Sequence, residues 1–228
     1  MELPNDFVEQ MQMMLGPKYN TFVEALSEPA PRSLRINPRK LKGKPKLRQV
    51  PWSSKGYYAK KDTLFTLDPG LHAGAYYVQE PSSMFLEQAL SQLLDLREPC
   101  MALDLCAAPG GKSTLLASLL PDASLIVANE VIKPRARVLA ENVAKWGQAN
   151  ILVSNNDPVD FRELPGFFDV VVVDAPCSGE GLFRKDPEAI KEWSVDHVQL
   201  CCERQQRILG EAWQTLRPGG LLLYSTCT

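Results

Sequence analysis

The alternation of short apolar runs with helical patterns after residue 100 constrains the fold most. Four apolar runs, CMALDLC, SLIVAN, ILVSNND and FFDVVVVDAP, share this stretch with the helical patterns KSTLLASLL and RARVLAENVAKWG. This order is typical of right-handed βαβ units around a parallel sheet. Val170–Val173 is apolar on both faces, as a central strand covered by helices must be. With LLLYST as a fifth strand, we predict a doubly wound parallel sheet of the α/β class.

The N-terminal region predicts a smaller helical part followed by an irregular one. Asn5 or Asp6 can cap a first helix, which Gly16 would end. A second helix is predicted over Tyr19–Leu26, before two prolines break the pattern. Residues 32–67 are rich in proline, glycine and basic side chains, which favours an irregular or small β-containing segment.

Two amphipathic helices are predicted in the rest of the chain. The first covers Ser82–Leu96. The second is long, covers Asp196–Leu216, and is predicted to bury a side that includes Cys202 and Trp213. We therefore expect an N-terminal helical and basic region over residues 1–67 and a ligand-binding domain over residues 68–228.

Composition excludes several classes of protein. Hydrophobic residues are 45% and charged residues 23% of the chain, which is ordinary for a globular protein. The apolar runs are shorter than the roughly 18 residues that a membrane span needs. The start, MELPNDFVEQ, does not resemble a secretory signal, so we expect a cytoplasmic protein with reduced cysteines. Six cysteines without C-x-x-C spacing, and only His72 and His197, predict no metal site.

The net charge of −2 hides a strong asymmetry along the chain. Arg32–Lys61 contains eleven basic residues and no Asp or Glu. Trp52, Tyr57 and Tyr58 lie within this run, and cations mixed with aromatic rings are typical of surfaces that bind nucleic acid. The alternative is a basic surface that only keeps the protein soluble.

Ligands of a doubly wound sheet lie beyond the carboxyl ends of its strands. The first predicted strand runs into a glycine-containing turn, Asp104–Lys112, where backbone can approach a ligand closely. Glu130 follows the second strand, where a carboxylate can accept both hydroxyls of a ribose. Asp157 follows the third strand and is positioned to meet an adenine edge. The pattern predicts a nucleotide-like ligand.

Three ligand classes fit such a turn to different degrees. A dinucleotide site needs G-x-G-x-x-G, which the turn lacks. A P-loop NTPase is a closer alternative, because Cys106–Ser113 matches G-x-x-x-x-G-K-S except at its first glycine. S-adenosylmethionine has a ribose, an adenine and an amino-acid tail but no phosphate, and it accounts for the carboxylates at successive strand ends. We therefore favour this cofactor.

Two cysteines follow the fourth and fifth predicted strands, Cys177 and Cys227. A thiolate that adds to C6 of cytosine makes C5 nucleophilic enough to accept a methyl group from a sulfonium. Asp174 could hold or donate a proton at the N3/N4 edge of the ring, and the second cysteine could assist when the C5 proton leaves. The alternative is that both cysteines are small buried residues. We assign that structural role to the other four cysteines.

At these residues the sequence resembles the Nol/Nop/Sun family of RNA cytosine-5 methyltransferases, within it the bacterial ribosomal RNA branch. The matching blocks span nearly the whole chain, and the paired Pro-Cys-Ser and Thr-Cys motifs are the most specific. The blocks are Pro31–Asn37, Gly74–Ser83 with Gln79, Asp104–Lys112, Glu130 with Arg135, Asp157, Asp174–Gly181 and Ser225–Cys227.

The resemblance implies a class I methyltransferase fold, which is Rossmann-like, and a role for each motif. It implies that Cys227 is the nucleophile on C6, that Cys177 aids product release, and that Asp174 belongs to the site. Arg35, Asn37 and Gln79 would bind RNA, with rRNA a more probable substrate than tRNA. The implied cofactor-binding residues are Ala107, Ala108, Pro109, Gly110, Gly111, Lys112, Glu130, Arg135, Asp157 and Asp174.

The chain departs from the family at its C-terminus. Members continue through two more strands after the Thr-Cys motif, whereas this chain ends at Thr228. We expect a piece of a longer protein that lacks the last strands, binds cofactor weakly and turns over little or not at all. An RNA-binding or assembly factor without catalysis is therefore the main alternative, and the P-loop NTPase is the less favoured one. The sequence leaves the oligomeric state open.

Overall fold

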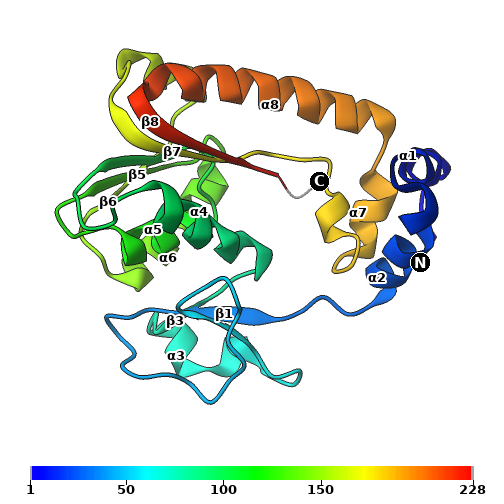
Figure 1. Cartoon of the computed structure of the whole chain (residues 1–228), viewed down its shortest axis with the longest axis horizontal. Coiled ribbons are helices and arrows are strands. Elements are labelled where there is room, and N and C mark those ends of the chain that lie inside the picture. The colour runs from blue at the N-terminus through cyan, green and yellow to red at the C-terminus, as the bar shows by residue number, and fades with distance from the viewer. Residues whose placement is uncertain (1, 227–228) are drawn as a thin grey trace. The chain divides into compact units, whose positions relative to one another are not determined.

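The computed structural model describes residues 2–226, and their contacts divide the chain into two compact units. Among the described residues, the helical unit comprises residues 2–30, Ala175–Leu209 and residues 225–226. The sheet unit comprises Pro31–Asp174 and Gly210–Tyr224. The elements of both are labelled in Figure 1. The boundary at residue 67 stays a prediction.

A five-stranded sheet forms the centre of the sheet unit and confirms the predicted fold class. Its strand order is β6-β5-β4-β7-β8, and β4 pairs in parallel with both β5 and β7, while β5 pairs in parallel with β6. Successive strands are added on one side of β4 as far as β6 and on its other side from β7, so the strand order reverses between β4 and β7, which is where doubly wound sheets bind ligands. The strands are β4 (Met101–Asp104), β5 (Leu125–Asn129), β6 (Ile151–Ser154), β7 (Phe168–Asp174) and β8 (Leu216–Ser225).

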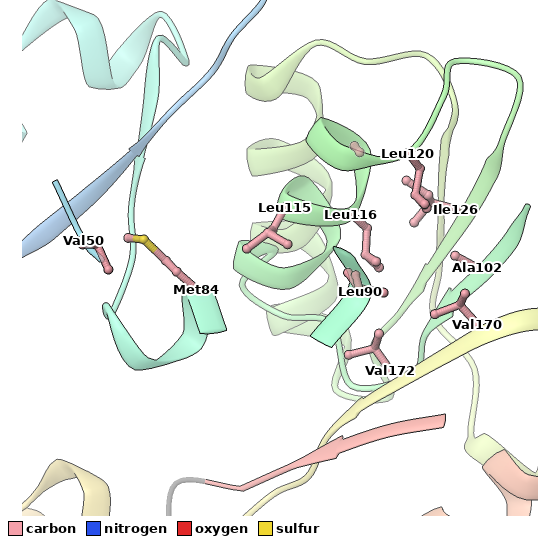
Figure 2. Packing of buried hydrophobic residues seen from close by; sticks show 11 residues of the cluster. Val50, Met84, Leu90, Ala102, Leu115, Leu116, Leu120, Ile126, Val170 and Val172 are labelled. Atoms are coloured by element: carbon pink, nitrogen blue, oxygen red, sulfur yellow. The ribbon is translucent and has the colours of Figure 1, made fainter. Parts of the chain in front are cut away.

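Helices cover this sheet and enclose its core. Val170–Val173 on β7 is buried at every position, as its apolar sequence predicts. Figure 2 shows the side chains of one apolar cluster. They come from the sheet and from helices α4 and α5, and Val50 and Met84 come from segments that precede α4 in the chain. The helices of the unit are α3 (Pro69–His72), α4 (Leu86–Leu93), α5 (Gly111–Leu119) and α6 (Lys133–Trp146), with 3-10 turns η2 (Phe65–Leu67), η3 (Ser82–Phe85) and η4 (Pro158–Glu163).

A small antiparallel sheet, in the order β2-β1-β3, also belongs to the sheet unit. Its strands are β1 (Ser33–Ile36), β2 (Gly56–Tyr58) and β3 (Tyr76–Val78). The first two confirm the β-containing segment predicted within residues 32–67, and β3 adds a strand beyond it. Buried side chains from all three strands, including Leu34, Tyr57 and Tyr76, form a separate small core.

The helical unit is held together by aromatic packing. Phe7 on α1 lies with its ring centroid 5.2 Å from that of Phe183 and 5.4 Å from that of Trp193, both edge-on. The elements of this unit are α1 (Asn5–Leu15), η1 (Gly16–Lys18), α2 (Tyr19–Ser27), η5 (Glu180–Leu182) and α7 (Pro187–Glu192), together with α8 (Val195–Thr215) as far as Leu209.

Three details of the helices differ from the sequence prediction. Helix α1 begins after Pro4 and has no side-chain cap, so Asn5 and Asp6 lie inside it. The helix predicted over Ser82–Leu96 is a 3-10 turn followed by the shorter α4. On α8, Cys202 is exposed and Trp213 is 65% exposed, whereas Cys201, Ile208 and Ala212, which the pattern also places on the buried side, are buried as predicted. The short helix α7 was not predicted.

The buried guanidinium of Arg35 connects the small sheet to helix α5, which packs on the large sheet. Arg35 on β1 is 1% exposed, and its Nε donates a 2.8 Å hydrogen bond to Gln79 Oε1. Its Nη2 donates to Thr114 Oγ1 at 2.7 Å and to the carbonyl of Gly111 at 3.2 Å, both on α5. The guanidinium carbon lies 4.7 Å from the ring of Trp146. Burial lowers the pKa of Arg35 to about 9.

Replacing Arg35 should destabilise the sheet unit strongly. In Arg35→Met the acceptors on α5 and Gln79 lose a charged donor, so we expect the free energy of unfolding to fall by about 3 kcal/mol or more. Urea unfolding measures this. The control is Arg39→Met in the same basic run, where a half-exposed ion pair with Asp122 should contribute less than about 1 kcal/mol. Equal losses in the two variants would contradict the role given to Arg35.

Candidate cofactor-binding site

The turn between β4 and α5 is built on a glycine that no other residue replaces without strain. Gly110 precedes α5 with a φ of 112°, in the left-handed region that disfavours side chains. A Cβ at this position would also lie 3.2 Å from Leu139 Cδ1 on α6. The turn can therefore lie close against α6 while the first residues of α5 stay open to a ligand.

A pocket of about 170 Å³ lies beside this turn, within the sheet unit. Asp174, which ends β7, lines it together with Ala107, Ala108, Pro109, Gly111 and Lys112. Four other residues predicted to bind the cofactor are not among its walls, namely Gly110, Glu130, Arg135 and Asp157. β3 and the residues after it form the rest of the wall. The lining residues are Tyr77, Val78, Gln79, Glu80, Ser83, Cys106, Ala107, Ala108, Pro109, Gly111, Lys112 and Asp174.

Charged groups of opposite sign meet at this pocket. Lys112 Nζ lies 2.6 Å from Asp174 Oδ2, so an ion pair joins the first turn of α5 to the end of β7. Asp104 is fully buried at the end of β4, and its Oδ2 accepts a 2.6 Å hydrogen bond from Ser113. Its Oδ1 has no hydrogen-bond partner among the described residues. Sequence reasoning did not assign a role to Asp104 or Ser113, because neither has a local signal beyond its place in the turn.

Burial also changes the titration of two groups at this turn. The pKa of Asp104 is raised to about 6, chiefly by desolvation, which the bond from Ser113 and the charge of Lys112 oppose. Desolvation and then the charges of Asp104 and other carboxylates raise the pKa of Cys106 to about 12. Cys106 is therefore a neutral thiol at pH 7 and a poor nucleophile, in agreement with the structural role assigned to it.

Contacts within the protein fix the orientation of the Glu130 carboxylate, directly after β5. Its side chain is 3% exposed, and Oε1 accepts a 2.9 Å hydrogen bond from the backbone N–H of Ile132. Oε2 lies 3.3 Å from Arg135 Nη1, while Arg135 Nη2 donates a 3.0 Å hydrogen bond to the carbonyl of Ala108. Arg135 therefore links the carboxylate of Glu130 to the glycine turn and fixes their relative positions.

Asp157 has a local structural role at the end of β6. It caps η4, and its Oδ1 accepts a 3.0 Å hydrogen bond from the backbone N–H of Val159. Asp160 completes a capping box by accepting from the backbone N–H of Asp157. The capping bond explains the conformation of this turn, and contact with an adenine stays a prediction.

The three residues predicted to bind RNA lie inside the protein, and this placement corrects the prediction. Arg35, Asn37 and Gln79 are 1%, 0% and 7% exposed. Arg35 donates to Gln79, and Asn37 Nδ2 donates to the carbonyls of Gly74 and Trp146 at 3.0 and 2.9 Å. Because these polar groups are buried and already bonded within the protein, they tie the small sheet to α5 and α6.

Of the two cysteines predicted to have chemical roles, only Cys177 lies among the described residues. Cys177 is half-buried in the helical unit, in a segment where Gln205 Nε2 donates a 2.8 Å hydrogen bond to the carbonyl of Pro176. Ser178 donates its hydroxyl to the carboxylate of Glu180 at 2.8 Å. Cys227 lies outside the described residues.

Comparison with protein families then identifies the chain. Residues 91–228 match the family model of the 16S rRNA methyltransferases RsmB/F, and residues 3–81 match the N-terminal domain of the 16S rRNA methyltransferase RsmF. The chain belongs to the RsmB/F family. The family resemblance predicted from the sequence is confirmed.

Curated relatives of this RsmB/F chain carry the name ribosomal RNA small subunit methyltransferase F. The protein from Enterobacter sp. (strain 638) is 35% identical and that from Erwinia tasmaniensis is 37% identical, each over 99% of this chain and 50% of the relative. The chain thus spans about half the length of the curated relatives it matches.

Solved structures agree with the RsmB/F fold. The crystal structure of PH0851 has a TM-score of 0.89 and 26% identity, over 99% of this chain and 53% of that protein. A methyltransferase homolog protein from Pyrococcus horikoshii has a TM-score of 0.77 and 28% identity, over 99% of this chain and 78% of that one. Both likenesses extend over nearly all of the present chain.

No helix within residues 2–226 has the length and apolar character to cross a membrane. No group of three or more His, Cys, Asp or Glu side chains in the same range is arranged to hold a metal ion.

The raised pKa of Asp104 predicts a distinct pH dependence of stability. The folded chain binds more protons than the unfolded one between the ordinary pKa of 3.8 and about 6, so this group lowers stability as the pH rises through that window. Asp104→Asn removes the effect. We expect the wild type to lose up to about 3 kcal/mol relative to this variant between pH 4 and pH 7. Urea unfolding at several pH values measures it, with the exposed Asp122→Asn as control. Parallel profiles for all three proteins would refute the assignment.

Proposed function

We propose that this RsmB/F chain binds S-adenosylmethionine and belongs to an enzyme that methylates C5 of cytosine in small-subunit rRNA. The observation that carries the proposal is a pocket in a chain of this family, at the place where the strand order reverses between β4 and β7. It is lined by Ala107–Pro109, Gly111, Lys112 and Asp174, among other residues. Family membership favours this function over the P-loop NTPase alternative. A cytoplasmic location follows from the proposed substrate.

The residues present fit the parts of S-adenosylmethionine. Glu130 offers a buried, pre-oriented carboxylate for two ribose hydroxyls, and Asp157 is proposed to meet the adenine. The open glycine turn and the pair of Lys112 and Asp174 suit the ammonium and carboxylate of an amino-acid tail. Asp104 adds a buried acceptor that no described residue uses. When bound, the cofactor supplies a methyl group activated by a positive sulfur.

The chain's own residues supply the activation of cytosine in this proposal. The thiolate of Cys227 adds to C6 of the ring, which gives C5 the electron density to accept a methyl group. Asp174 holds a proton at the N3/N4 edge during this step. Cys177 aids product release by accepting the C5 proton as the bond from sulfur to C6 breaks, which regenerates the thiolate of Cys227. The roles of both cysteines rest on the family motifs.

The basic run supports RNA as the substrate class. All of its eleven cationic residues except Arg35 are exposed. Clustered exposed Lys and Arg attract a phosphate backbone and release its counterions, which makes binding depend on salt. The curated relatives are named for small-subunit rRNA, and we propose that RNA for this chain too. Detection of 5-methylcytosine by bisulfite sequencing, after incubation with rRNA and S-adenosylmethionine, separates this enzyme from an RNA-binding factor without catalysis.

Neutralising Glu130 should weaken cofactor binding. In Glu130→Gln the ribose loses a charged acceptor, so we expect the Kd for S-adenosylmethionine to rise about 10- to 100-fold in calorimetry. Glu141→Gln, on the exposed side of α6, is the matched control and should bind like the wild type. An unchanged Kd in a folded Glu130→Gln variant would show that the cofactor does not use this carboxylate.

Removing Cys177 should trap the RNA covalently. If Cys177 aids release, Cys177→Ala forms the bond between Cys227 and C6 but resolves it slowly. With rRNA and S-adenosylmethionine we expect an adduct that survives denaturing electrophoresis. The adduct should be absent from the double variant Cys177→Ala/Cys227→Ser and from the exposed control Cys202→Ala. No adduct from Cys177→Ala in a full-length form of the protein, although both ligands bind, would overturn the mechanism.

A further inference from the structure

A second pocket lies against the outside of the glycine turn, within the sheet unit. Its volume is about 290 Å³, and it shares Tyr77, Val78 and Pro109 with the cofactor-binding pocket. We call it the aromatic pocket. No residue predicted to contact RNA or cofactor lines it except Pro109. Its lining residues are Leu71, Gly74, Tyr76, Tyr77, Val78, Pro109, Asn142, Lys145 and Trp146.

Hydrogen bonds keep the wall between the two pockets in place. The hydroxyl of Tyr77 donates to the carbonyl of Pro109 at 3.1 Å, and Asn142 Nδ2 donates to the same oxygen at 2.8 Å. The ring of Trp146 packs edge-on against the ring of Tyr77, with the ring centroids 6.5 Å apart. Desolvation raises the pKa of Tyr77 to about 12, so the phenol is neutral at pH 7. The wall is largely apolar and uncharged.

Close packing between the small sheet and α6 forms the floor of the pocket. Gly74 lies against the carbonyl of Lys145, and any side chain at this position would collide with that oxygen. Lys40 Nζ donates to the same carbonyl at 2.6 Å and to the carbonyl of Ala73 at 2.9 Å. The aromatic pocket is therefore bordered by Lys40, which belongs to the basic run, and by the ammonium group of Lys145.

An apolar wall beside a cation matches one chemical class of ligand. A nucleobase of any type stacks on aromatic and prolyl rings, and Lys attracts the phosphate next to it. A purely apolar ligand would make no use of the ammonium group of Lys145, whose hydrogen bond to Asn142 Oδ1 is 3.4 Å long. A free anion would make no use of the apolar wall. The combination favours a nucleotide within a longer RNA.

We propose that the aromatic pocket binds an unstacked nucleobase of the RNA, close in the strand to the cytosine that is methylated. The inference rests on the proposed function, because it takes RNA as the substrate. Tyr77, Val78 and Pro109 provide the stacking face, and Lys145 contacts the neighbouring phosphate. Since the two pockets share this wall, the base held here positions the strand relative to the cofactor.

Crosslinking tests the location with the unaltered protein. Fluorescent single-stranded fragments of small-subunit rRNA are first screened by anisotropy with S-adenosylmethionine present. The fragment that binds most tightly is then resynthesised with 4-thiouridine at one position at a time. We expect irradiation at one position to crosslink peptides containing residues 71–78 or 142–146, identified by mass spectrometry. Crosslinks confined to other parts of the chain would overturn the proposal.

Base removal combined with charge reversal tests the energetics. An abasic site at the crosslinking position should weaken binding of the same RNA about 5-fold or more, as expected for the loss of one stacked base. Lys145→Glu should weaken binding of the intact RNA and reduce the effect of the abasic site. The matched control is Arg137→Glu, an exposed cation on the same helix outside the pocket.

The outcomes separate this inference from the proposed function. If no rRNA fragment binds and none is methylated, the proposed function fails. If RNA binds or is methylated, yet abasic sites have no effect at any position and Lys145→Glu behaves like Arg137→Glu, the aromatic pocket is not a base site. If Lys145→Glu does not fold, as thermal unfolding would reveal, the crosslinking and abasic series on the unaltered protein still decide the question.

Discussion

The attachment of the small antiparallel sheet to helices α5 and α6 is the constraint on which both pockets depend. Arg35 and Asn37 make this attachment with buried side chains that donate to backbone carbonyls on the two helices. Lys40 adds a third tie to α6 at the surface. Because β3 is bonded to β1, these ties hold Tyr77 and Val78 beside the glycine turn, where they line both pockets.

Three carboxylates and two cations lie around the glycine turn and the neighbouring strand ends. Asp104 and Glu130 are buried, Glu130 lies 3.3 Å from Arg135, and the half-exposed Asp174 pairs with Lys112. Burying carboxylates without matched cations costs stability, and the raised pKa of Asp104 is the sign of that cost. A cationic ligand would offset it. The buried carboxylates therefore lower the stability of the free protein and, for the same electrostatic reason, raise its affinity for a positively charged cofactor.

The sequence predicted those parts of this structure that local pattern determines. Apolar strands, the helices between them and the glycine turn all follow from neighbouring residues, and strand ends placed Lys112 and Asp174 at one site correctly. Arg35 shows the limit of this reasoning, because an arginine in a basic run looks exposed until its partners on α5 are known. Trp213 shows it too: the pattern identifies an amphipathic helix but gives only an approximate direction for its buried face.

The shared wall between the pockets gives a physical reason for RNA and cofactor to influence each other's binding. Pro109 belongs to the glycine turn, and its carbonyl accepts from both Tyr77 and Asn142, which line the aromatic pocket. In the proposed complex a base stacked on Tyr77 and the cofactor would contact opposite sides of this wall. Because coupling between two binding sites is reciprocal, a base that raises the affinity for the cofactor is itself bound more tightly by the cofactor-bound protein. Positive coupling of this kind would favour methyl transfer only when the RNA strand is already in position.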